Sequence, residues 1–217
     1  MWLLWMTAAE EGCDMALLSR IPLNDPKEKI EIISGKGMAT PPAAGGKEVV
    51  MAGARAVLRS AYPPSAWVQV VLHPETQDEW HPPEIGTKRV ERLDADHLFQ
   101  QAAIQMLGGT IQIKRQIVVG IDWMTISDQK LRNCWYAEDP TPYQRNIAAW
   151  VDDSPWQKIG YGGWDVDPLP DGGSRVSYQM WVEAEILPAS VLAWGMSRTL
   201  PTLMNAFEAR VASLNPR

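Results

Sequence analysis

The sequence predicts an α+β fold in which a curved antiparallel β-sheet wraps around a long C-terminal α-helix. Two β-type runs, 156–169 and 174–187, are joined by the turn sequence Pro-Asp-Gly-Gly, as in a β-hairpin, and the second run alternates between apolar and polar residues. Residues 188–214 follow directly and carry apolar side chains every three or four positions, which is typical of an amphipathic helix. The chain lacks the regular succession of strands and helices that indicates a parallel sheet. A hairpin that runs into a long helix favours a sheet that grips this helix, with a ligand expected between the two.

The period of two is clearest in residues 174–187. The mostly apolar side chains that share one face of this run are Val176, Tyr178, Met180, Val182, Ala184 and Ile186. Those of the other face are Arg175, Ser177, Gln179, Trp181, Glu183 and Glu185. Because successive side chains of a strand point to opposite faces of a sheet, we expect the first set to be packed and the second to face solvent.

The remaining sequence divides into an N-terminal extension, residues 1–47, and one domain, residues 48–214. The extension is expected to be partly ordered, and its β-type run 29–34 could add an edge strand to the sheet. Within the domain we expect a first strand at 48–61 and a short helix at 66–72, behind prolines that a first helical turn tolerates. Further strands are predicted at 87–93, 98–107, 110–124 and 144–152, before the hairpin and the closing helix.

The composition excludes several classes of function. The chain has 217 residues and a formal net charge of −6, with no lysine- or arginine-rich block, so nucleic-acid binding is disfavoured. No stretch approaches the roughly 20 apolar residues of a membrane span, which leaves at most transient contact with a membrane. Cys13 and Cys134 are the only cysteines, so one disulfide is possible and the redox compartment stays open. Without a signal-peptide core, a cytoplasmic location is the default expectation.

One charged residue falls on a face of the predicted sheet that is otherwise apolar. The residues that share this face in the run 110–123 are Ile111, Ile113, Arg115, Ile117, Val119, Ile121 and Trp123. An unpaired charge is costly to bury, so Arg115 is a candidate to bind a carboxylate, phosphate or carbonyl of an apolar ligand. Two alternatives stay open, because a local bulge could turn Arg115 to solvent or a buried acid could pair with it.

No motif of the sequence indicates a catalytic, metal or cofactor site. His73, Glu75, His81 and Glu84 fall in one proline-containing stretch, but their spacing differs from that of a usual zinc site, so an ordinary loop is preferred. The glycines among residues 160–163 lie inside a strand-like run, which argues against a dinucleotide fingerprint and favours sheet curvature. A Gly-x-Ser-x-Gly nucleophile motif is absent. We therefore expect no cofactor and no metal.

Three segments carry a family resemblance across residues 48–214. Residues 61–72 place two prolines before a short helix that ends in leucine, residues 78–82 (Asp-Glu-Trp-His-Pro) form a turn, and Pro188 begins the closing helix. In this order the segments resemble the START-like, helix-grip superfamily (SRPBCC-type), which includes lipid-transfer START domains, the birch-pollen allergen family and bacterial polyketide cyclases. One departure is that many lipid-transfer members carry Arg-Asp in a middle strand, where this chain has Arg115 followed by Gln116.

The resemblance implies a hollow half-barrel closed by the terminal helix, with an apolar ligand inside. We expect a bacterial lipid-binding or polyketide-cyclase-like member that binds, or transfers, a hydrophobic small molecule or lipid without catalysis. One alternative is a polyketide cyclase or aromatase in which Arg115 and Tyr178 polarise carbonyls or move protons. Another is a protein-interaction module whose cavity is filled by its own side chains. The residues expected to line a ligand cavity are Ile113, Arg115, Ile117, Trp123, Tyr178, Met180, Val182, Met196, Leu200 and Leu203.

Overall fold

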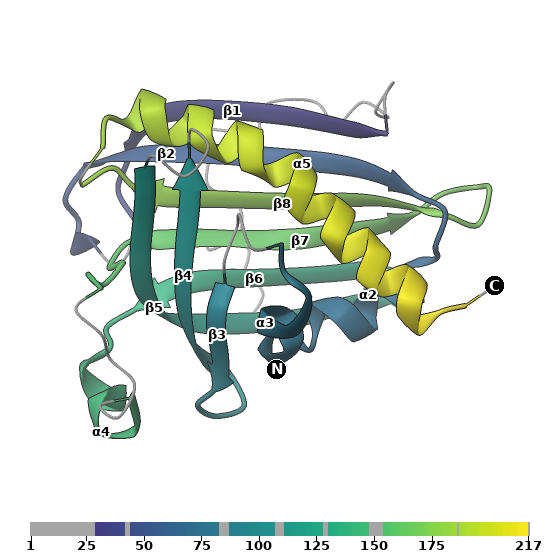
Figure 1. Cartoon of the computed structure of the whole chain (residues 1–217), viewed down its shortest axis with the longest axis horizontal. Coiled ribbons are helices and arrows are strands. Elements are labelled where there is room, and N and C mark those ends of the chain that lie inside the picture. Colours follow the sequence, from purple (N-terminus) through teal and green to yellow (C-terminus); the bar gives the residue numbers. More distant parts are fainter. Residues whose placement is uncertain are drawn as a thin grey trace, which may run out of the picture.

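A computed structural model of the protein describes residues 29–41, 44–82, 87–106, 111–127, 130–147, 154–185 and 187–216. These residues form an eight-stranded antiparallel sheet with the strand order β1-β2-β8-β7-β6-β5-β4-β3. The strands are β1 (Ile30–Ala39), β2 (Val49–Ser60), β3 (Thr87–Arg92), β4 (His97–Met106), β5 (Ile111–Ser127), β6 (Lys130–Glu138), β7 (Gly160–Pro168) and β8 (Ser174–Glu183). The long helix α5 (Ala189–Leu214) crosses the concave face of the curved sheet (Figure 1). The predicted α+β fold, a curved antiparallel sheet around a C-terminal helix, is therefore confirmed.

Short helices occupy two of the connections between strands. The segment between β2 and β3 contains α2 (Pro64–Val71), a 3-10 turn (Pro74–Thr76) and α3 (Gln77–Trp80), and proline begins both α2 and the 3-10 turn. A second 3-10 turn (Thr141–Tyr143) and α4 (Gln144–Ile147) follow β6. Helices α2 and α3 lie beside the C-terminal half of α5 (Figure 1), where the ring of Trp80 in α3 meets Phe207 in α5.

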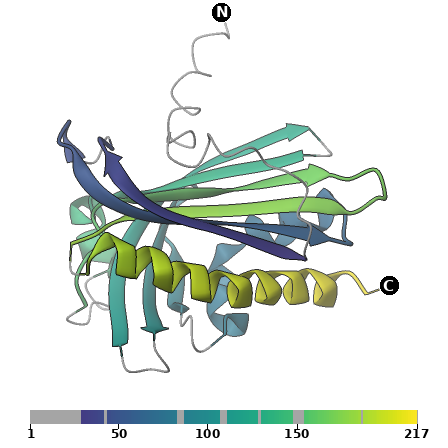
Figure 2. The same ribbon diagram turned by 90° about the horizontal axis from the view of Figure 1, so that it is seen from above.

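Strand β5 makes the corner of the sheet. Its first part pairs with β4 from Ile111 to Gly120, and its second part pairs with β6 from Val118 to Ser127, so only a short central stretch has neighbours on both sides. In Figure 1, β3, β4 and the first part of β5 run across the direction of β6, β7 and β8, and the view from above shows the same divergence for β4 and the first part of β5 (Figure 2). This change of direction gives the concave face its depth.

The main core lies between the concave face and α5. The helix buries a continuous apolar stripe that includes Met196, Leu200, Leu203, Met204, Phe207 and Val211. Beneath it, β2 presents Ala52, Ala54 and Ala56, which are fully buried in the same cluster. Because alanine side chains are short, the helix can lie close to this strand.

Strand β1 forms one edge of the sheet and pairs with β2 along its whole length. It extends well beyond the run 29–34 in which a possible edge strand was expected. Beside its first residue, Lys29 Nζ lies 2.7 Å from Glu208 Oε2 of α5. The division of the chain into an extension and a domain at residue 47 stays a prediction, although β1 shares its sheet with the strands that follow.

The strand predicted at residues 144–152 is wrong. Residues Gln144–Ile147 are helical, and residues 148–153 lie outside the described residues. The preceding turn explains the helix, because the Asp139 carboxylate accepts hydrogen bonds from the backbone N–H of Thr141 at 3.0 Å and from its hydroxyl at 2.7 Å. Pro142 then fits the first helical turn. The strand that belongs in this part of the sheet is β6, which the sequence pattern did not predict.

The predicted solvent-facing side of β8 is wrong at Trp181, which is 1% exposed. The indole lies across Gly53 of β2, where an added Cβ would come within 2.3 Å of the ring. Met51, Ile159 and Tyr161 pack around it in a second apolar cluster, on the face of the sheet away from α5. A glycine on the neighbouring strand therefore provides the space that buries this tryptophan.

Ser177 is also buried on that face, where it forms a hydrogen bond with another buried polar side chain. Its hydroxyl accepts a 2.7 Å hydrogen bond from Nε of Arg55, which is itself buried on β2. Burial lowers the pKa of the Arg55 guanidinium, while the nearby Asp165 raises it.

Cys134 of β6 is buried and disulfide-bonded, and Cys13, the other cysteine of the sequence, lies outside the described residues.

Candidate ligand-binding cavity

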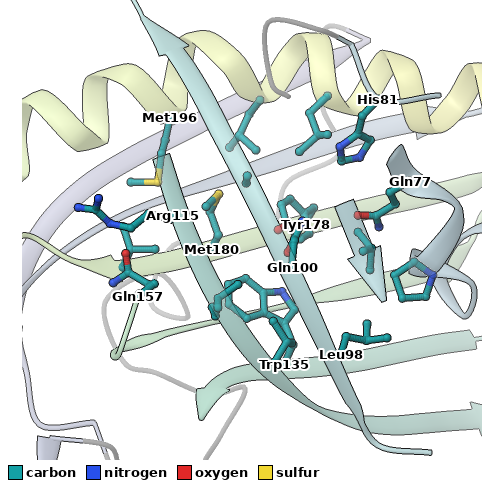
Figure 3. A pocket seen from close by; sticks show the side chains of 18 of the residues that line it. Gln77, His81, Leu98, Gln100, Arg115, Trp135, Gln157, Tyr178, Met180 and Met196 are labelled. Atoms are coloured by element: carbon teal, nitrogen blue, oxygen red, sulfur yellow. The ribbon is translucent and has the colours of Figure 1, made fainter. Parts of the chain in front are cut away.

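A cavity of about 240 Å³ lies between the concave face of the sheet and α5. Strands β3 to β8, the segment around α2 and α3, and helix α5 all contribute to its wall. The apolar part of the wall includes Leu98, Val119, Ile121, Met180, Leu192 and Leu203. Figure 3 shows labelled side chains from both the sheet and the helix converging on this space.

Every predicted lining residue whose side chain the structure describes contributes to the cavity wall. The set comprises Ile113, Arg115 and Ile117 from β5, Tyr178, Met180 and Val182 from β8, and Met196, Leu200 and Leu203 from α5. The Trp123 side chain lies outside the described part of the chain. Asn133 of β6, the residue opposite Trp123 in the sheet, lines the wall. A ligand-binding role for the lining residues stays a prediction.

The regular pairing of β5 aims Arg115 at the cavity. Arg115 is opposite Ala102 of β4, and the ladder between the two strands runs without a register shift, which excludes the bulge considered above. Ile113, Arg115 and Ile117 therefore share the inward face. In the close-up, Arg115 lies at one end of the cavity, near Gln157 and Met196 (Figure 3).

The charge of Arg115 is only partly balanced. Among the described residues it forms no ion pair with a carboxylate, and its Nη1 donates to the backbone oxygen of Lys114 at 2.8 Å. Burial lowers the pKa of the guanidinium, and the attraction of Glu185 opposes this shift. Glu183 also lines the cavity, and burial together with repulsion from Glu185 raises the pKa of its carboxyl group. This end of the cavity, which we call the outer end, is its charged part.

The middle of the cavity carries a partly buried phenol that is hydrogen-bonded to an indole. Trp135 of β6 lies over Gly162 of β7, where a Cβ would come within 2.6 Å of the ring. The missing side chain lets the indole extend across β7 to β8, where it forms a side-chain hydrogen bond with Tyr178. Since an indole N–H can only donate, the tyrosine oxygen is the acceptor. Burial raises the pKa of Tyr178, so its hydroxyl keeps its proton and remains a donor.

Aromatic rings close the opposite end, which we call the inner end. The ring of Phe207 lies 4.6 Å from that of Trp164, 4.8 Å from that of Trp80 and 5.6 Å from that of His81, measured between centroids. Burial lowers the pKa of His81 to about 4, so its imidazole is neutral at pH 7. His81, Trp164 and Phe207 all line the cavity.

Comparison with solved structures identifies the architecture. Human STARD10 aligns with a TM-score of 0.60 at 12% identity, over 90% of this chain and 74% of that chain. Human StAR-related lipid transfer protein 5 aligns with a TM-score of 0.58 at 11% identity, over 88% of this chain and 89% of that chain. The chain has a START-like, helix-grip fold. The Zhui aromatase/cyclase from a Streptomyces species shares it, with a TM-score of 0.50 at 11% identity over 76% of this chain and 97% of that chain.

No family model and no curated protein sequence matches the chain. At identities of 11–12% the solved structures establish the START-like fold alone. What this chain binds therefore depends on the residues of its own cavity.

Several polar residues of the START-like cavity were not predicted from the sequence. They are Gln77, His81, Gln100, Asn133, Gln157 and Glu183. Gln100 could have been found, since it alternates with Leu98 and Ala102 in a run that was predicted as a strand. Glu183 was assigned to the solvent-facing side of β8, and Asn133 belongs to β6, which was not predicted at all.

The histidine-rich stretch shows no metal-type geometry. Among the described residues, no group of three or more His, Cys, Asp or Glu side chains could hold a metal ion. His73 instead pairs with Glu75 at 3.0 Å on the surface, and His81 turns to the cavity. Glu84 lies outside the described residues. No helix in the described part of the START-like fold is long and apolar enough to cross a membrane.

Proposed function

We propose that this protein binds one hydrophobic small molecule or lipid between the sheet and α5, and carries it without chemical change. The observation that supports this function is the unfilled, mostly apolar space of about 240 Å³. Protein interiors are normally packed as densely as organic crystals, and an empty void in a core costs stability. The void argues against a protein-interaction module whose cavity is filled by its own side chains.

The dimensions of the cavity favour a narrow ligand. Along α5 the lining residues extend from Leu192 to Phe207, which is about 22 Å at a helical rise of 1.5 Å per residue. Pockets for drug-sized ligands usually have volumes of about 300–1,000 Å³. A smaller volume stretched over this length suits one acyl chain or one flat ring system better than a lipid with two acyl chains.

Arg115 is the proposed anchor for an acidic head group. Its guanidinium lies at the outer end of the cavity, beside the apolar side chains of Ile113 and Ile117. A carboxylate placed there would form a charge-assisted and partly desolvated hydrogen bond, which is stronger than a neutral one. The ligand class that fits both features is a single-chain anionic amphiphile.

The first test is the variant Arg115→Met, which keeps much of the side-chain length but removes the charge and the donors. Losing a charged hydrogen bond of about 1.5–3 kcal/mol should weaken the binding of a fatty acid by more than tenfold. Stability should be unchanged or higher, because a partly buried charge is removed. Isothermal titration calorimetry and urea melts would measure the two effects.

Lys114→Met is the matched control, since Lys114 is the exposed neighbour on the other face of β5. It should leave the affinity unchanged. Equal affinity of wild type and Arg115→Met would remove Arg115 as the anchor. Failure of wild-type protein to bind any amphiphile, with no small molecule found on it by native mass spectrometry, would overturn the carrier function.

A polyketide cyclase or aromatase is a second candidate, because the cavity holds partly buried polar groups suited to proton transfer. The Tyr178 phenol remains protonated and could donate to a substrate carbonyl, while the raised pKa of Glu183 brings that carboxyl closer to neutrality. A cyclase should convert a poly-β-ketone thioester into a ring product detectable by mass spectrometry, and Tyr178→Phe should slow this conversion. Recovery of the thioester with no more ring product than forms in protein-free buffer would favour the carrier.

A further inference from the structure

The inner end of the cavity holds polar side chains remote from Arg115. Asn133 of β6 and Gln77 of α3 line the wall there, together with His81. Figure 3 shows Gln77 and His81 on the side of the cavity opposite to Arg115 and Gln157. The cavity therefore has polar groups at both ends, and apart from Tyr178 and Gln100 the side chains between them are mostly apolar.

Asn133 is the most deeply buried of these groups. It is 4% exposed, and it lies between Trp164 of β7 and Trp123 of β5 in the sheet register. Within the described residues, its side-chain amide makes no hydrogen bond to another residue. Buried amides are nearly always hydrogen-bonded, because leaving one without a partner is unfavourable. A polar atom inside the cavity is the available partner.

The distance between the two ends indicates an elongated ligand. Asn133 is opposite Trp123, which is eight residues beyond Arg115 on β5, or about 26 Å along the strand at 3.3 Å per residue. The bend of β5 shortens the direct path. On the helix side, Met196 lies near Arg115 and Phe207 contacts His81. One chain-like molecule lying along α5 would reach from Arg115 to Asn133.

We propose that the cavity selects a single-chain amphiphile with oxygen functions at both ends. An acidic head group would pair with Arg115, and a hydroxyl or carbonyl at the far end of the chain would be hydrogen-bonded by Asn133 and Gln77. This inference rests on the proposed carrier function and specifies its ligand class. An amide offers both a donor and an acceptor, so it matches a hydroxyl in either direction. An unsubstituted fatty acid would place its methyl end against these amides and leave them without a partner.

The experiment compares saturated fatty acids of graded length with their ω-hydroxy derivatives. At the best-fitting length, the ω-hydroxy acid should bind wild-type protein roughly three to ten times more tightly, the gain expected from one net hydrogen bond. Asn133→Leu, which is close in shape but apolar, should abolish this preference and leave the affinity for the plain acid equal or higher. Gln77→Met should reduce the preference.

Thr199→Val is the matched control inside the cavity. Thr199 lines the wall, but its hydroxyl is already within 3.2 Å of the backbone oxygens of Gly195 and Met196 in α5. This variant should keep the full preference for the ω-hydroxy acid.

The outcomes separate the two proposals. Equal binding of the plain and ω-hydroxy acids by wild-type protein would overturn the inner polar site. This result is expected if a bound water molecule forms the hydrogen bonds of the Asn133 amide. It would leave the carrier function standing. Absence of binding by either series would overturn both proposals.

If Asn133→Leu fails to fold, NMR of wild-type protein provides the test. The side-chain amide resonances of Asn133 should shift when the ω-hydroxy acid is added and should not shift with the plain acid. Unchanged resonances would contradict the inference.

Discussion

At the scale of single residues, burial sets the charge of His81. The side chain packs against Trp80 and Phe207, which lowers its pKa from an unfolded value near 6.5 to about 4. At a pH between these two pKa values, His81 binds a proton in the unfolded chain but not in the folded protein. Stability should therefore fall as the pH falls from about 6.5 to about 4, by roughly 3 kcal/mol for this residue.

Urea melts of wild type and His81→Gln across this pH range would measure the contribution. Wild type should lose more stability than the variant as the pH falls, because glutamine has no proton to gain. His73→Gln makes the same substitution at an exposed position, where it removes only the surface pair with Glu75, so its curve should stay close to that of wild type. Parallel curves for wild type and His81→Gln would show that His81 is not the group responsible.

Arg115 and Asn133 illustrate which site residues the sequence could reveal. Arg115 interrupts a run of isoleucines and valines with a strict period of two, so its inward orientation followed from the pattern. Asn133 lies between Arg132 and Cys134 in a short polar stretch, and its burial depends on the tertiary packing of Trp164 and α2 above β6. A local sequence pattern does not predict such tertiary packing.

At the scale of elements, two glycines on the first hairpin should respond differently to the same substitution. Gly35 and Gly53 are directly paired on β1 and β2. A Cβ at Gly53 would come within 2.3 Å of the Trp181 indole, whereas a Cβ at Gly35 meets no atom within 4 Å. Gly53→Ala should therefore destabilise the protein by about 1–3 kcal/mol through overpacking.

Gly35→Ala is the internal control, and it should be neutral or slightly stabilising because alanine restricts the unfolded chain. The two variants would be compared by their urea midpoints and by the fluorescence of the protein, since Trp181 must move in one of them. Equal midpoints would mean that Trp181 can leave Gly53 without cost.

The elements with strong periodicity were predicted well, and those shaped by tertiary contacts were not. The closing helix and the final hairpin follow from repeated apolar positions. In β6, polar Asn133 and Arg132 obscure the alternation, and its strand conformation depends on ladders to β5 and β7 on either side. In α4, the capping by Asp139 is a side-chain interaction that a hydrophobicity pattern does not register.

At the scale of the whole molecule, Phe207 joins the parts that enclose the cavity. It is 2% exposed on α5 and meets Trp80 of α3 and Trp164 of β7. Phe207→Ala should cost about 3–5 kcal/mol, because it removes a buried ring and enlarges the cavity. Leu214→Ala, at a position of α5 that is 41% exposed, should have little effect.

A ligand should partly rescue the Phe207→Ala variant. Anything that binds only the folded state stabilises it, and the enlarged inner end can accept a longer chain. Thermal melts with fatty acids of increasing length should show the largest gain at a greater length for the variant than for wild type. An identical optimum would place the end of the ligand away from Phe207.

The order of the elements along the chain has a consequence for protein synthesis. All eight strands of the described sheet precede α5, and the concave face that α5 covers is made first. Until the helix emerges from the ribosome, this apolar face remains open to water, and such a surface attracts chaperones and promotes aggregation. The step that protects the nascent sheet also creates the cavity. A ligand present in the cell at that moment could be enclosed as the chain folds, instead of entering a finished protein.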